Sequence, residues 1–228
     1  MRRFLALGFV LLWTLGLAGA AELLAKGQFA AAYTEAERAG DWVTAARAAS
    51  YYAIYQAKDK RAKEAWFQKA EAAAKRAIQE DPQNPEAHFE LARALGRLAQ
   101  YRGILQSLSL AGAVRDHLNR ALKLRPDYAS AMVALALWHL ELSQKGVGWL
   151  YGADGGKVIP LFERAIVLEP KRIIHRYEYA RALFRLGKKQ EALKQLELAL
   201  SLPPQDARDE YVLEEAQELL EKILKERK

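Results

Sequence analysis

The chain has 228 residues, 51% of them hydrophobic, and a formal net charge of +7 at pH 7. The hydrophobic content supports a substantial core and excludes a disordered chain, and the absence of cysteine excludes disulfides, thiolate metal sites and cysteine nucleophiles. No run of Lys or Arg of the kind that binds nucleic acid occurs. Scarce Asn and Met beside abundant Arg, Lys and Glu indicate a thermophilic source.

Residues 1–20 have the features of a signal peptide. Arg2 and Arg3 precede an apolar run over residues 4–17, and residues 18–20 (AGA) offer the small side chains that a signal peptidase needs. We expect cleavage after Ala20, which predicts a periplasmic or secreted protein with no stable membrane insertion after cleavage. The alternative is a retained membrane anchor, although the run is short for a span of about 20 residues.

Residues 21–228 predict a single all-α domain of repeated helix pairs. Four helices end alike, with a small alanine five residues before a proline, which cannot continue a helix. These endings are Ala77 and Pro82, Ala121 and Pro126, Ala165 and Pro170, and Ala199 and Pro204. Apolar residues at three- and four-residue steps predict a further helix after each of the first three prolines. The repeat-like units cover about residues 26–82, 83–126, 127–170 and 171–204, and Asp41 is the expected N-cap of a helix in the first.

The last of these units resembles the tetratricopeptide repeat (TPR), a helix–turn–helix of about 34 residues. Pro170 and Pro204 are 34 positions apart, and "LGKKQEAL" resembles the family's turn into its second helix. The two preceding units are extended to 44 residues, with ten extra residues between their helices. The resemblance implies a TPR-like right-handed helical-hairpin solenoid, and residues 206–228 predict an amphipathic capping helix at its C-terminal end.

A narrower resemblance is carried by "EAHFELARALGRLAQ", "AGAVRDHLNRALKLRPDYASAMVALALWHLEL" and "RALFRLGKKQEALKQLELAL". These segments, in this order, look like the regulator of microtubule dynamics protein family. The likeness covers roughly residues 60–223 and implies the fold. It does not carry the family's name over as an activity, because an exported protein would meet no microtubules.

A glycine-rich stretch, "GWLYGADGGKVIP" at residues 148–160, interrupts the helical pattern. It fails as a phosphate loop, because Tyr151 stands where the first glycine is needed and Val158 follows Lys157 in place of Ser or Thr. An offset of 44 residues places it opposite "YRGILQSLSLAGA" in the preceding unit. We therefore expect both stretches to be insertions that fold back between two helices.

In the glycine-rich insertion we expect a short helical turn that tucks Trp149 and Tyr151 against the repeats. Asp154 is expected to cap the next helix, and Pro160 to lie in its first turn. If the insertions also wall a pocket, its lining would be Trp138, Trp149 and Tyr151. That possibility supports an alternative function as a small-molecule carrier or periplasmic transport accessory protein.

No residue pattern indicates catalysis. The histidines (His88, His117, His139 and His175) show no metal-ligand spacing, and no serine has the context of a nucleophile. We expect no cofactor, no metal and no enzymatic activity.

The leading prediction is a non-enzymatic scaffold that binds a protein or peptide partner on the concave face of the array, and a homo-oligomer is possible. TPR proteins usually bind ligands against the first helix of each pair, and the resemblance places seven residues there. These are Phe89, Arg93, Arg97, Leu137, Tyr177, Arg181 and Arg185. Arginines among aromatics suit a peptide carboxylate. The alternative is that the charges pair internally, Glu90 with Arg93 or Arg97 and Glu178 with Arg181 or Arg185.

Overall fold

The computed structural model describes residues 19–101 and 104–226, and every regular element in them is helical. The predicted signal segment, residues 1–18, lies outside the described residues, and the first helix begins at Ala20. The longer helices are α2 (Phe29–Ala39), α3 (Trp42–Tyr51), α4 (Lys60–Glu80), α5 (Pro85–Leu98), α6 (Ile104–Leu124), α7 (Ala129–Gln144), α9 (Val158–Leu168), α10 (Ile173–Arg185), α11 (Lys189–Leu200) and α12 (Ala207–Lys225). Short elements are α1 (Ala20–Ala25), a π-helical turn (Tyr52–Gln56), α8 (Gly148–Tyr151) and a 3₁₀ turn (Gly155–Lys157).

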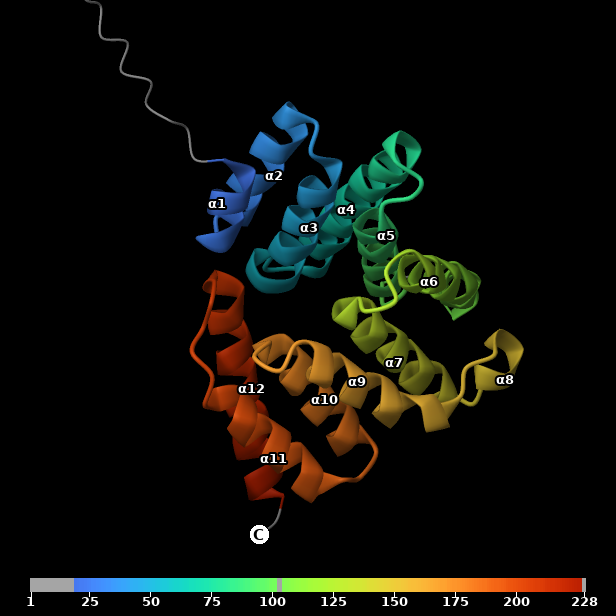
Figure 1. Cartoon of the computed structure of the whole chain (residues 1–228), viewed down its shortest axis with the longest axis vertical. Coiled ribbons are helices and arrows are strands. Elements are labelled where there is room, and N and C mark those ends of the chain that lie inside the picture. Colours follow the sequence, from blue (N-terminus) through green and yellow to red (C-terminus); the bar gives the residue numbers. More distant parts are fainter. Residues whose placement is uncertain (1–18, 102–103, 227–228) are drawn as a thin grey trace, which may run out of the picture.

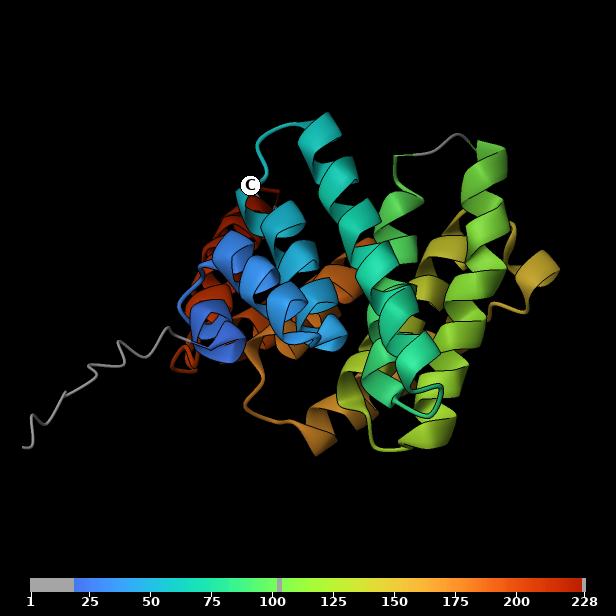
Figure 2. The same cartoon turned by 90° about the horizontal axis from the view of Figure 1, so that it is seen from above.

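Local chemistry sets the helix boundaries as the sequence predicts. The Asp41 side chain accepts a hydrogen bond from the Thr44 backbone N–H at 3.0 Å and caps α3. Asp154 accepts from the Gly156 N–H at 2.8 Å, and Pro160 lies in the first turn of α9, so both predictions are confirmed. Neighbouring helices pack along the chain as α5 with α6, α7 with α9 and α10 with α11 (Figures 1 and 2).

The two insertions differ from each other, contrary to prediction. The first does not fold back: residues 104–112 belong to α6, which continues to Leu124 without a break. The second forms the separate turn α8, bounded by Gly146 and Gly152, both at φ +71°. The sequences explain the difference, because the second insertion places Gly146 and Gly152 at left-handed corners and a proline at the start of the next helix, whereas Gly112 of the first lies inside α6 and no proline follows it there.

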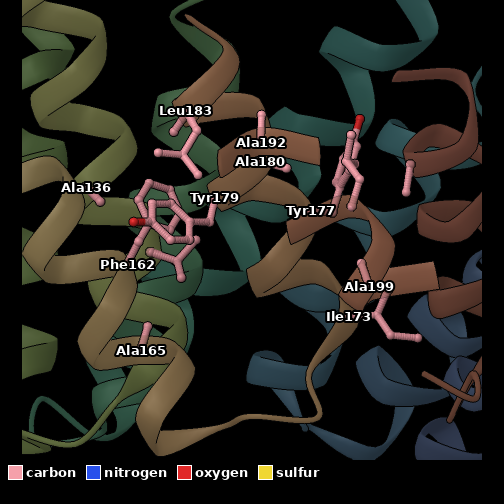
Figure 3. Close-up of a cluster of buried hydrophobic side chains, with 14 of the residues drawn as sticks. Ala136, Phe162, Ala165, Ile173, Tyr177, Tyr179, Ala180, Leu183, Ala192 and Ala199 are labelled. Atoms are coloured by element: carbon pink, nitrogen blue, oxygen red, sulfur yellow. The ribbon is translucent and has the colours of Figure 1, made fainter. Parts of the chain in front are cut away.

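Small and aromatic side chains build the core between α7, α9, α10 and α11. Phe162 is fully buried and stacks on Tyr179, with ring centroids 5.0 Å apart and planes inclined by 17°. Figure 3 shows this pair between α9 and α10, with Ala136 and Ala165 close by and Tyr177 on the other side of α10. The alanines at the helix crossings let the helices approach closely, as the repeat pattern predicts.

The array returns on itself, so that α12 contacts the N-terminal helices (Figure 1). Tyr211 stacks on Tyr55 with centroids 5.0 Å apart, and the Arg208 guanidinium donates to the Tyr51 hydroxyl at 2.8 Å. Gly27 comes so close to Ala207 that an added Cβ would lie 2.9 Å from the Ala207 Cβ. We call this contact the clasp; it comprises Phe29, Tyr51, Tyr55, Gln56, Arg208 and Tyr211.

Replacing Phe162 by Ala is expected to lower the free energy of unfolding by about 3–5 kcal/mol, because a fully buried ring leaves a cavity. Urea unfolding followed by circular dichroism measures the change. Val167, which is 79% exposed on the same helix, is the matched control, and Val167→Ala is expected to stay within about 0.5 kcal/mol. Equal effects of the two substitutions would contradict this packing.

Candidate functional site

We call the side of the array formed by the first helix of each pair (α5, α7 and α10) its inner face. One buried carboxylate on α5 organises the charges there. Glu90 of α5 is fully buried, accepts a hydrogen bond from Arg47 of α3 at 3.0 Å and forms an ion pair with Arg93. Arg47 also bonds to Glu86 at 2.6 Å. Burial acts to raise the pKa of Glu86, but Arg47 and the neighbouring Arg125 hold it below its usual value. These charges therefore tie α3 to α5 and are not free for a ligand.

Two arginines that are distant in the sequence, Arg93 of α5 and Arg208 of α12, lie against the ring of Tyr51. The guanidinium of Arg93 lies 4.8 Å from the ring centroid and that of Arg208 lies 5.5 Å from it. Burial acts to raise the pKa of Tyr51, yet the charges of Arg208 and Arg93 leave it below the usual value. Tyr51 thus joins the Glu90 network to α12.

A second network occupies the inner face of α10. Arg181 forms an ion pair with Glu178 at 2.8 Å, and its guanidinium lies 5.6 Å from the Tyr177 ring centroid. Burial, and then the charge of Glu215 of α12, raise the pKa of Tyr177 above its usual value. Burial, and then the charge of Glu178, raise the pKa of Glu215 above its usual value. The internal pairing that the sequence left open is therefore formed by Glu90 with Arg93 and by Glu178 with Arg181.

The predicted binding residues fall into a closed set and an open set. Phe89 and Tyr177 are buried, and Arg93 is nearly so. Arg181 and Arg185 keep 40% and 36% of their side chains exposed, although Arg185 pairs with Glu141 at 2.8 Å. The open set comprises Arg97, Leu137, Arg181 and Arg185, of which Arg97, Arg181 and Arg185 lie in the C-terminal parts of α5 and α10 and Leu137 lies in the middle of α7.

Arg97 differs from the other inner-face arginines. Within residues 19–101 and 104–226 its guanidinium forms no ion pair and no hydrogen bond, although the side chain is half-buried. Its charge acts on Tyr55 of the π-helical turn and on Glu215 of α12. Arg97, half-buried near the end of α5, therefore keeps its hydrogen-bonding capacity unused.

The expected pocket of Trp138, Trp149 and Tyr151 is not formed. Trp149 is 79% exposed at the tip of α8, so the prediction that it tucks against the repeats is wrong. Trp138 is buried and donates from its indole to the Ala111 carbonyl at 2.9 Å. Tyr151 is half-buried, and its carbonyl accepts a hydrogen bond from Arg115. Because α8 is a single short turn, Trp149 points away from the core against which Tyr151 packs.

The glycine-rich insertion is held by a histidine. The backbone N–H of Asp154 donates to Nδ1 of His139 at 3.0 Å, which requires that nitrogen to be unprotonated. Burial, and then the charge of Lys157, lower the pKa of His139 and favour this form. His139 is thus a packed structural residue, and Lys157 is exposed.

Sequence spacing missed a histidine contact because the two partners come from different helices. Nδ1 of His88 on α5 lies 2.9 Å from Nδ1 of His117 on α6, and Nε2 of His88 lies 3.1 Å from the Pro82 carbonyl. One shared proton between the two Nδ1 atoms satisfies both rings. No group of three or more candidate metal ligands exists in the described part of the chain.

Ser130, His175 and Glu169 stand in the order of a hydrolytic triad. Nε2 of His175 lies 3.2 Å from the Ser130 hydroxyl, but its Nδ1 is 3.7 Å from the Glu169 carboxylate, too far for a hydrogen bond. Burial, and then the charges of Arg172 and Arg208, lower the pKa of His175 from 6.5 to about 3. An imidazole that resists protonation this strongly is a poor general base at neutral pH, so the geometry does not support catalysis.

Among residues 19–101 and 104–226, no helix combines the length and apolar character needed to cross a membrane.

The helix pairs and their packing define the class of this protein as a TPR-like helical solenoid. A solved thermophilic TPR protein of Thermus thermophilus superposes on it with a TM-score of 0.63 at 21% sequence identity, over 87% of this chain and 95% of that one. The likeness extends to the fold alone.

The particular family follows from the sequence comparison. The model of the regulator of microtubule dynamics protein 1-3 family matches residues 28–150, and the chain belongs to that family. Regulator of microtubule dynamics protein 3 of Xenopus laevis is 29% identical over 94 residues, 41% of this chain and 20% of the relative. The Bos taurus protein of that name is 26% identical over 156 residues, 63% of this chain and 33% of the relative. This chain thus spans between a fifth and a third of the length of these relatives.

Replacing Glu90 by Gln is expected to lower the free energy of unfolding by about 3 kcal/mol, because it leaves the partly buried Arg47 and Arg93 without their shared carboxylate. Glu80→Gln is the matched control: Glu80 is exposed and lies 3.7 Å from Arg76, so its loss is expected to change stability by less than about 1 kcal/mol. Urea unfolding of both variants checks the difference, and a Glu90 variant as stable as the control would rule out the network.

His175→Gln is expected to flatten the acid side of the stability–pH profile. His175 stays neutral in the folded protein down to about pH 3, whereas the unfolded chain binds a proton below about pH 6.5. The contribution of neutral His175 to the free energy of unfolding is complete above pH 6.5. It declines by up to about 1.4 kcal/mol per pH unit as the pH falls towards 3.

The destabilisation caused by His175→Gln should therefore shrink as the pH falls from about 7 to about 4 in urea titrations. A destabilisation that does not vary with pH would show that His175 does not titrate in the unfolded chain alone.

Proposed function

We propose that this protein is a non-enzymatic exported scaffold that binds a protein or peptide partner through the inner face of its TPR-like array. The TPR-like fold supports partner binding, and the triad-like group around His175 lacks the geometry for catalysis. Export is inferred from the basic start, apolar run and small residues of segment 1–20. The proposal does not take over an activity from the names of the relatives.

The observation that carries the proposal is the unused hydrogen-bonding capacity of Arg97, a member of the open set. Arg181 and Arg185 provide two further partly exposed guanidinium groups, and Leu137 adds apolar surface on α7. A planar guanidinium binds a carboxylate through two parallel hydrogen bonds. The partner segment is therefore proposed to present carboxylates next to an apolar side chain.

The small-molecule carrier alternative has lost its motivating feature. It required Trp138, Trp149 and Tyr151 to line one pocket, and Trp149 faces solvent instead. We therefore favour the scaffold.

The double substitution Arg97→Glu with Arg181→Glu is expected to reduce partner retention at least tenfold, about 1.4 kcal/mol, because it replaces the attraction of carboxylates with repulsion. Crosslinking pull-down from the envelope fraction of the producing cells, with the full chain as bait, measures retention.

Arg164→Glu is the control for this experiment, since Arg164 is exposed on α9 and the substitution makes the same type of charge reversal, at one position, away from the inner face. Retention that is equal in the wild type, the double variant and the control would contradict the proposal. So would the failure of the wild-type bait to retain any partner.

A further inference from the structure

We infer that the clasp is a releasable contact that controls access to the inner face of the array. This inference concerns the regulation of the site and rests on the proposed function. Five properties of the clasp support it. They are its position near Arg97, the ion pairs of Arg208, the polar groups of its other residues, the attachment of α12 to the C-terminal helices, and the π-helical turn.

The clasp lies near Arg97, the residue proposed to bind the partner's carboxylate. Arg93, one helical turn before Arg97 on α5, places its guanidinium 4.8 Å from the ring centroid of Tyr51, which belongs to the clasp. The charge of Arg97 also acts on Tyr55. Figure 1 shows α12 and the N-terminal helices approaching from the two ends of the chain. A segment that binds Arg97 must therefore lie where the closed clasp brings these two ends together.

The charged member of the clasp keeps its partners when the contact opens. Arg208 is largely buried and donates to Tyr51, but its guanidinium also lies 3.4 Å from Asp209 and 3.6 Å from Asp206. Both carboxylates belong to the start of α12 itself, so separation of the two ends leaves no isolated charge. Burying a charge whose partner is lost would be costly, and the clasp avoids that cost.

Of the remaining clasp residues, Phe29 is fully buried, whereas the others carry polar groups that tolerate water. Tyr211 and Tyr55 each carry a hydroxyl on an apolar ring, and Gln56 donates to the Gly27 carbonyl at 2.8 Å within the N-terminal half. The Gln56 contact with the Tyr211 hydroxyl is longer, 3.4 Å. Exposure of these groups replaces protein contacts by water contacts at small net cost.

The buried side of α12 packs on the C-terminal helices, and Tyr55 of the clasp packs against the same cluster. Val212, Ala216 and Ile223 are fully buried in the cluster shared with α10 and α11, so α12 stays attached to the C-terminal end of the array when the clasp opens. The opening is a displacement of the two ends of the solenoid from each other, with each end intact.

The π-helical turn at residues 52–56 fits the same interpretation. Such turns interrupt the α-helical register and occur mostly at functional positions. Here the turn follows α3 directly and provides Tyr55 and Gln56, two of the clasp residues on the N-terminal side.

The first test measures opening without any partner. Because the chain has no cysteine, spin labels on Ala39→Cys and Glu218→Cys, both exposed, report the distance between α2 and α12 by pulsed electron paramagnetic resonance. Tyr211→Ala and Arg208→Gln are expected to add a longer distance while helicity stays unchanged. Tyr151→Ala, a half-buried tyrosine on α8, is the control and is expected to leave the distance as it is. An unchanged single distance in both clasp variants would overturn the inference.

The second test locks the clasp. Gly27→Cys with Ala207→Cys places two Cβ atoms 2.9 Å apart before relaxation, so a small shift reaches the roughly 3.5–4.5 Å of a disulfide. The oxidised protein is expected to retain at least tenfold less partner in the envelope pull-down than the same protein after reduction. The reduced form controls for strain at residue 27, where φ is +74°.

The two tests separate the clasp from the proposed function. Equal retention by the oxidised and reduced forms would overturn the gate while partner binding stands. If neither the oxidised nor the reduced protein retained a partner, the proposed function would be overturned. A longer distance between the spin labels in the clasp variants would still support the releasable contact.

Discussion

The stacking of Tyr211 on Tyr55 joins two distant parts of the chain, and the geometry of the inner face depends on it. An array of helix pairs is held by contacts between neighbours, and its two ends are ordinarily free. Here α12 reaches the N-terminal helices, and the guanidinium groups of Arg93 and Arg208 lie 4.8 and 5.5 Å from the ring centroid of Tyr51. Part of the expected binding face is closed by this arrangement.

Charge pairing divides the inner face into a part that stabilises the fold and a part that is available to a ligand. Glu90 is fully buried between arginines of two helices, so its network stabilises the array and leaves little for a ligand. Arg97 lies about three turns from Glu86 on the same helix, yet it has no ion pair among the described residues. A half-buried cation with unused donors is the feature that favours an anionic partner at this end of the face.

Local signals in the sequence predicted the helices well, because prolines, caps and apolar periodicity act within a few residues. Asp41 and Asp154 cap their helices as expected. The 44-residue offset failed for the insertions, since a repeat register aligns positions but does not determine backbone geometry. The contact of His88 with His117, the exposure of Trp149 and the clasp depend on how helices are placed in space, and no short stretch of sequence encodes that.

The direct contact of the two ends is the central claim, and a double-mutant cycle on Tyr55 and Tyr211 tests it most directly. Urea unfolding of Tyr55→Ala, Tyr211→Ala and the double variant gives the coupling free energy between the rings. Stacked aromatic pairs contribute about 0.5–1.5 kcal/mol beyond their buried area, and a coupling of this size is predicted. A coupling of zero would show that the ends of the array do not touch.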